Sequence, residues 1–100
     1  MKIKSVGIMS PGDMGSAIGK VLSNSGLDVI TCLSGRSELT RLRAQESGMR
    51  NAPSIDQLVS EAELILSVLV PAEALALAEL IAGSVRRTGC HPVYADLNAI

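Results

Sequence analysis

The most informative segment of this 100-residue chain is Gly7-Ile8-Met9-Ser10-Pro11-Gly12-Asp13-Met14-Gly15. It begins inside an apolar run, Ile3 to Met9, which is typical of a short buried strand that stops at a turn rich in proline and glycine. A helix is predicted directly after the turn, because apolar residues then recur at the spacing of one helix face. These residues are Met14, Ala17, Ile18, Val21 and Leu22.

The turn between this strand and this helix has the spacing of a dinucleotide-binding loop. The middle and last glycines of the G-x-G-x-x-G pattern correspond to Gly12 and Gly15, and Ser10 stands in the place of the first. Gly12 would let the backbone approach a pyrophosphate, Gly15 would let the helix pack closely on the strand, and the first N–H groups of the helix would face the anion. The alternative is a glycine turn that serves packing alone. The predicted pyrophosphate-binding residues are Ser10, Pro11, Gly12, Asp13, Met14 and Gly15.

Strand-like and helix-like segments alternate through the rest of the chain. Further strands are predicted at Leu27 to Leu33, Met49 to Ala52, Leu64 to Val70 and Pro92 to Leu97. Further helices are predicted from Glu38 to about Ser47, from Ser54 to about Ser60, and from Ala72 to Val85. Such alternation predicts an α/β fold: a Rossmann-type, doubly wound parallel sheet with helices on both faces and strand order 3-2-1-4-5.

Several single residues support these boundaries. Gly26 and Gly48 suit the left-handed position after a helix, and Ser37 suits an N-cap. Ser54 and Gln57 have the spacing of a capping box. Pro71 fits the first turn of a helix. Gly15 and Gly19 would weaken their helix unless it approaches a strand closely.

The end of the second predicted strand indicates which dinucleotide is bound. An NAD site places an acidic residue about 20 residues beyond the glycines, where it binds the ribose 2′-hydroxyl. Here that segment is Ser34-Gly35-Arg36-Ser37, with no acid before Glu38. The Arg36 guanidinium and the Ser37 hydroxyl can both donate to a 2′-phosphate, and Arg41 lies one helical turn further along. The predicted cofactor is therefore NADP. The alternative for these arginines is a solvated surface charge.

At these residues the sequence resembles the β-hydroxyacid dehydrogenase family, which includes 3-hydroxyisobutyrate dehydrogenase, tartronate semialdehyde reductase and 6-phosphogluconate dehydrogenase. Ser10-Pro11-Gly12-Asp13-Met14-Gly15 is similar to the family's G-x-G-x-M-G loop, and Gly35-Arg36-Ser37 to its Asn-Arg-Thr triplet. Leu69-Val70-Pro71 resembles its Leu-Pro segment with one inserted position, and Asp96-Leu97-Asn98-Ala99 its Asp-x-Ser-Thr segment without the hydroxyls. The resemblance implies that Leu69, Val70, Pro71 and Asn98 also contact the cofactor.

The resemblance further implies hydride transfer between NADP(H) and a small hydroxy acid or its keto form. The family's catalytic lysine lies in or near a helical second domain, which also makes a homodimer. The present chain stops directly after its last predicted strand, at Asn98-Ala99-Ile100. We therefore expect residues 1–100 to be one dinucleotide-binding domain cut from a longer protein, without the catalytic lysine.

Three other functions are open at this point. Pyrroline-5-carboxylate reductases, which use NADP, have a similar glycine loop and an Ala-Ile pair like Ala17-Ile18. A Rossmann domain can also bind NADP as a non-catalytic module. A methyltransferase is disfavoured, because its site typically has an acid where this chain has Gly35-Arg36-Ser37.

The composition argues against several classes of partner and site. A net charge of −1 with a single aromatic residue, Tyr94, argues against a nucleic-acid partner. No apolar run approaches the roughly 20 residues that span a bilayer. Cys32 and Cys90 have neither disulfide-framework nor zinc-site spacing, and His91 alone cannot complete a metal site with them. We expect a cytoplasmic protein with reduced thiols whose partner is a small-molecule substrate.

Overall fold

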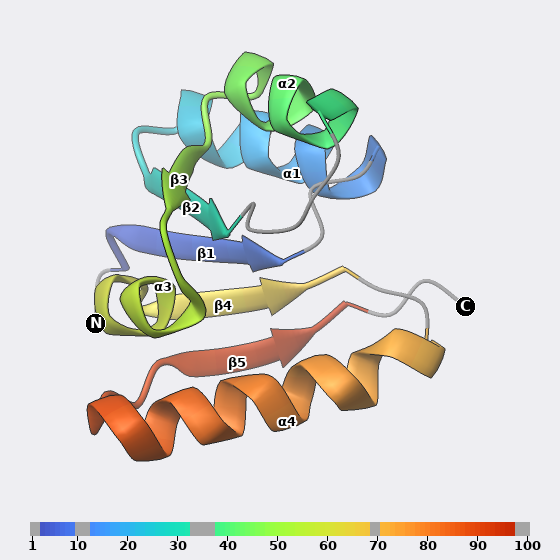
Figure 1. Ribbon diagram of the computed structural model, residues 1–100. Helices are drawn as coiled ribbons and strands as arrows, with labels where there is room; N and C mark the ends of the chain where they lie inside the picture. The colour runs from blue at the N-terminus through green and yellow to red at the C-terminus, as the bar shows by residue number, and fades with distance from the viewer. Residues whose placement is uncertain (1–2, 10–12, 33–37, 69–70, 98–100) are drawn as a thin grey trace.

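The computed structural model describes residues 3–9, 13–32, 38–68 and 71–97 of the chain. Strands and helices alternate along it, as the sequence predicts (Figure 1). The strands are β1 (Ser5–Met9), β2 (Asp28–Cys32), β3 (Arg50–Ala52), β4 (Leu64–Ser67) and β5 (Val93–Asp96). The helices are α1 (Asp13–Asn24), α2 (Glu38–Glu46), α3 (Ile55–Glu61) and α4 (Pro71–Thr88).

The five described strands form one parallel sheet in the order β3-β2-β1-β4-β5, so the predicted fold class and strand order are confirmed. Gly7 of β1 pairs with Ile30 of β2 on one side and with Ile65 of β4 on the other. β1 is therefore the centre of the sheet. The chain moves outward from it through β2 to β3, then crosses to the other side for β4 and β5.

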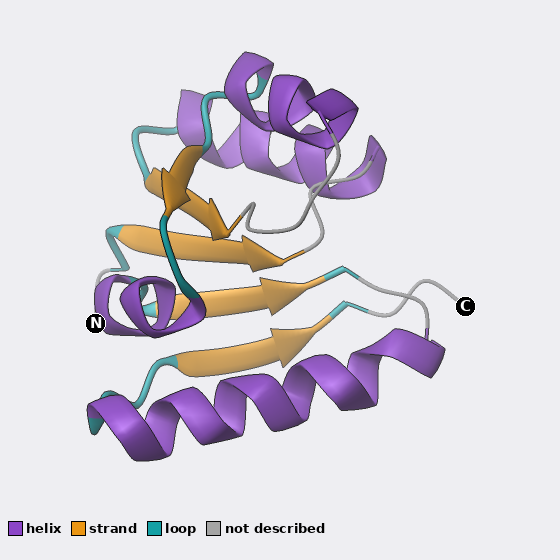
Figure 2. Cartoon of the chain, in the orientation of Figure 1, coloured by secondary structure: helices purple, strands orange, loops and turns teal. Residues whose placement is uncertain are grey.

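Side chains alternate between the two faces of the sheet, and each face has its own apolar core. Val6 and Ile8 of β1 are buried with Ala44 of α2, and Ile18 of α1 packs against this cluster. Met9 and Ile65 are buried on the other face with residues of α3 and α4. Helices thus cover both faces, α1 and α2 on one and α3 and α4 on the other, in an α/β/α arrangement (Figure 2).

Close packing explains two glycines inside regular elements. A Cβ on Gly19 would lie 2.8 Å from Sδ of Met49, which precedes β3, so α1 makes the close approach that the sequence predicts there. A Cβ on Gly7 would lie 3.0 Å from Cδ2 of Leu58, so α3 sits directly against β1.

The predicted turns are confirmed in backbone geometry, and one predicted cap is only half right. Gly26 and Gly48 adopt φ of 91° and 76°, the left-handed conformation expected after α1 and α2. Ser54 Oγ accepts from the Gln57 N–H at 3.1 Å, as in a capping box. The Gln57 side chain does not reach back to Ser54, however, because its Nε2 donates to Glu61 Oε2 at 2.7 Å.

The ends of two elements differ slightly from prediction. α4 continues past Val85 to Thr88, so Arg86 and Arg87 form its last turn. β4 ends at Ser67 in the structure, and the predicted strand residues Leu69 and Val70 lie outside the described part of the chain. Within the described residues, no helix combines the length and apolar character needed to cross a membrane.

Candidate functional site

The candidate site lies where the central strands β1 and β4 end. Met9, the last residue of β1, pairs in register with Ser67, the last residue of β4, and Ser67 pairs with Asp96 of β5. The arrowheads in Figure 2 all reach the same edge of the sheet. Because the chain leaves β1 and β4 toward opposite sides of the sheet, this edge is a topological switch point, where open α/β sheets bind ligands.

The helix that follows β1 begins at this edge. α1 starts at Asp13, four residues after Met9, and Gly15 is buried in its first turn. The first backbone N–H groups of a helix have no partner within the helix and carry partial positive charge. The start of α1 is therefore suited to hold a pyrophosphate, and a buried Gly15 agrees with the close packing predicted for it.

The structure describes five of the predicted site residues. Asp13, Met14 and Gly15 open α1, Pro71 is the first residue of α4, and Arg41 is exposed in the first turn of α2. The others lie outside the described residues. They are Ser10, Pro11, Gly12, Ser34, Gly35, Arg36, Ser37, Leu69, Val70 and Asn98.

Sequence reasoning missed two buried hydroxyls near the same edge. Thr31 is the last residue but one of β2, and Ser67 is the last residue of β4; both are fully buried. Neither Thr31 Oγ1 nor Ser67 Oγ has a hydrogen-bond partner. The available signal was a small polar residue inside an otherwise apolar run. Because both hydroxyls are covered by protein atoms, they lie in the interior of the chain and not on a surface that a ligand reaches.

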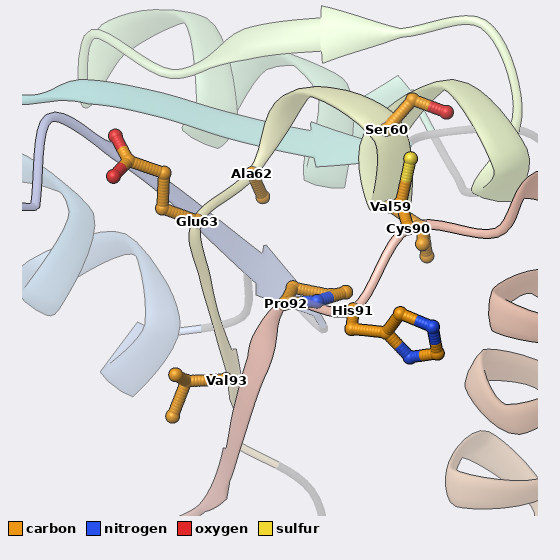
Figure 3. A pocket seen from close by; sticks show the side chains of 8 residues that line it. All are labelled: Val59, Ser60, Ala62, Glu63, Cys90, His91, Pro92 and Val93. Atoms are coloured by element: carbon orange, nitrogen blue, oxygen red, sulfur yellow. The ribbon is translucent and has the colours of Figure 1, made fainter.

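A pocket of about 280 Å³ lies at the opposite edge of the sheet, between the end of α3 and the start of β5. Figure 3 shows that its polar side chains diverge: the Glu63 carboxylate and the His91 ring project in different directions. Glu63 Oε1 already accepts from the Lys4 N–H at 3.0 Å. His91 is exposed in the loop before β5. No group of three His, Cys, Asp or Glu among the described residues could hold a metal.

The ionisable groups with shifted pKa values also lie away from the switch point. Hydrogen bonds from Arg50 and Gln57 lower the pKa of Glu61, and hydrogen bonds from Arg87 and Ser84 lower the pKa of Asp56. Arg50 bridges Asp28 at 3.0 Å and Glu61 at 2.9 Å, which ties β2, β3 and α3 together. These groups hold elements to one another and form no acid–base pair at the candidate site.

Comparison with known proteins identifies a family and similar solved structures. Residues 1–86 match the family model described as acetohydroxy acid isomeroreductase, NADPH-binding domain. Among solved structures, a conserved protein of unknown function with structural similarity to 3-hydroxyacid dehydrogenases is 28% identical, with a TM-score of 0.73. That match covers 94% of this chain and 34% of the other. No curated protein sequence matches the chain.

Two enzymes share the fold at lower identity. The imine reductase of Streptomyces aurantiacus has a TM-score of 0.73 at 21% identity, over 96% of this chain and 32% of its own. The 3-hydroxyisobutyrate dehydrogenase of Mycobacterium tuberculosis has a TM-score of 0.68 at 16% identity, over 97% of this chain and 32% of its own. The chain therefore spans about a third of the length of the structures that it matches.

Proposed function

The chain belongs to the family of acetohydroxy acid isomeroreductase NADPH-binding domains, and from that premise we propose that it is the NADP(H)-binding part of an oxidoreductase acting on a small hydroxy acid or its keto form. The observation that carries the proposal is the switch point at the ends of β1 and β4, with the start of α1 beside it. Bound NADPH would supply a hydride to the substrate, and NADP⁺ would accept one.

The residues present fit such a cofactor. The first N–H groups of α1 would bind the pyrophosphate, and Gly12 would let the backbone come close to it. Arg36, Ser37 and Arg41 would bind the 2′-phosphate, with Arg41 already exposed in the first turn of α2. The chain's own contribution is thus to bind and orient the cofactor.

Names among the related proteins support the substrate class. The family description contains an acetohydroxy acid, and one structural neighbour is a 3-hydroxyisobutyrate dehydrogenase. Both names include a small hydroxy acid, in agreement with the resemblance to β-hydroxyacid dehydrogenases and the 6-phosphogluconate dehydrogenase group. We assign the catalytic lysine and the homodimer contacts to a part of the protein outside residues 1–100, since the chain spans about a third of the matched structures.

Calorimetric titration of the chain with NADP⁺ and NAD⁺ tests the cofactor assignment. A charge-assisted contact to the 2′-phosphate is worth about 1.5–3 kcal/mol, so NADP⁺ should bind roughly ten- to a hundredfold more tightly than NAD⁺. Arg36→Ala should remove most of that preference. Arg86→Ala, which removes a cation from the last turn of α4 at the other end of the molecule, is the matched control. A folded chain that binds neither nucleotide would refute the proposal.

A further inference from the structure

We draw no further inference here: the strongest candidate, the apolar surface formed by the flank of α1 and the adjoining face of β4 and β5, where Val21, Val93 and Leu97 are exposed, carries nothing because nothing in the structure shows what covers it.

Discussion

Gly7 and Leu58 meet at the centre of the molecule: a Cβ added to Gly7 would lie 3.0 Å from Cδ2 of Leu58 and 3.3 Å from Cβ of Ala62. Leu58 is fully buried between α3 and the sheet. The absence of a side chain at Gly7 therefore sets how closely α3 approaches β1. That distance matters for the site, because β1 ends at the sheet edge where α1 begins.

Gly7→Ala should destabilise the chain through this contact. The added methyl group has to displace Leu58 or shift α3, and overpacking of a core of this kind costs about 1–3 kcal/mol. Urea unfolding followed by circular dichroism would measure the loss. The denaturant dependence should stay unchanged, because the fold is the same and only its stability differs.

A double-mutant cycle tests whether the loss of stability comes from the contact with Leu58 or from any side chain added at this position of strand β1. In a Leu58→Val background, which removes a methyl-sized group at the same place, Gly7→Ala should cost clearly less than in the unaltered chain. Equal costs in both backgrounds would show that Leu58 is not the source of the strain.

Gly83→Ala should stabilise the chain, in contrast to Gly7→Ala. Gly83 lies within α4, and its Cβ would meet only the ends of two flexible side chains, Arg87 Nη1 at 3.3 Å and Arg86 Nη2 at 3.8 Å. Replacing glycine by alanine inside a helix gains about 0.5–1 kcal/mol. A higher midpoint in the same urea experiment is expected; a lower one would mean that the arginines cannot move aside.

Asp56 should make the stability of the chain depend on acid pH. Arg87 donates to it at 2.9 Å, and the buried Ser84 donates at 2.6 Å, and these bonds lower its pKa. The contribution is therefore fully present above the ordinary aspartate pKa, about 4, and is lost as the pH falls through the lower folded-state value. The difference in melting temperature between the unaltered chain and Asp56→Asn should shrink as the pH falls from 6 toward 2.

Two arginines in the last turn of α4 provide the control for that experiment. Arg87→Gln should weaken the acid dependence, because it removes the first cause of the shift. Arg86→Gln removes the same charge one residue away but no bond to Asp56, and should leave the dependence intact. If both variants act alike, general charge rather than the α3–α4 bridge is responsible.

The sequence was sufficient for the order of elements but not for the contacts between them. Apolar runs, helical stripes and turn residues such as Gly26 and Gly48 are local signals, so the strand order could be predicted, including the short β3. The need for a glycine at position 7 could not be predicted from the sequence. Its neighbour Leu58 is 51 positions away, and only the folded chain brings the two residues together. The sequence likewise does not show that the Ser67 hydroxyl, within an apolar run, is buried without a hydrogen-bond partner. Only the folded structure shows which atoms surround it.

The ion pairs of Arg50 should contribute little to the unfolding free energy, and that contribution should fall as the salt concentration rises. Arg50 pairs with Asp28 and Glu61, but its side chain is 46% exposed. Exposed pairs contribute about 0–1 kcal/mol, so Arg50→Gln should lower the unfolding free energy by less than about 1 kcal/mol. In 1 M NaCl, where charges are screened over about 3 Å, the difference should largely vanish. A difference that persists at high salt would point to the two-sided hydrogen bonding of the guanidinium, which Arg50→Lys would also lose.

NADP⁺ should stabilise the chain against unfolding, because it binds the folded sheet edge and not the unfolded chain. At a hundred times its dissociation constant, a ligand adds about 2.7 kcal/mol to the unfolding free energy. NAD⁺ at the same concentration should raise the melting temperature less, because it lacks the 2′-phosphate that Arg36 and Arg41 are predicted to bind. Arg41→Ala, a substitution at an exposed position of α2, should bring the NADP⁺ shift closer to that of NAD⁺. Equal shifts with the two nucleotides in the unaltered chain would contradict a 2′-phosphate site at the end of β2.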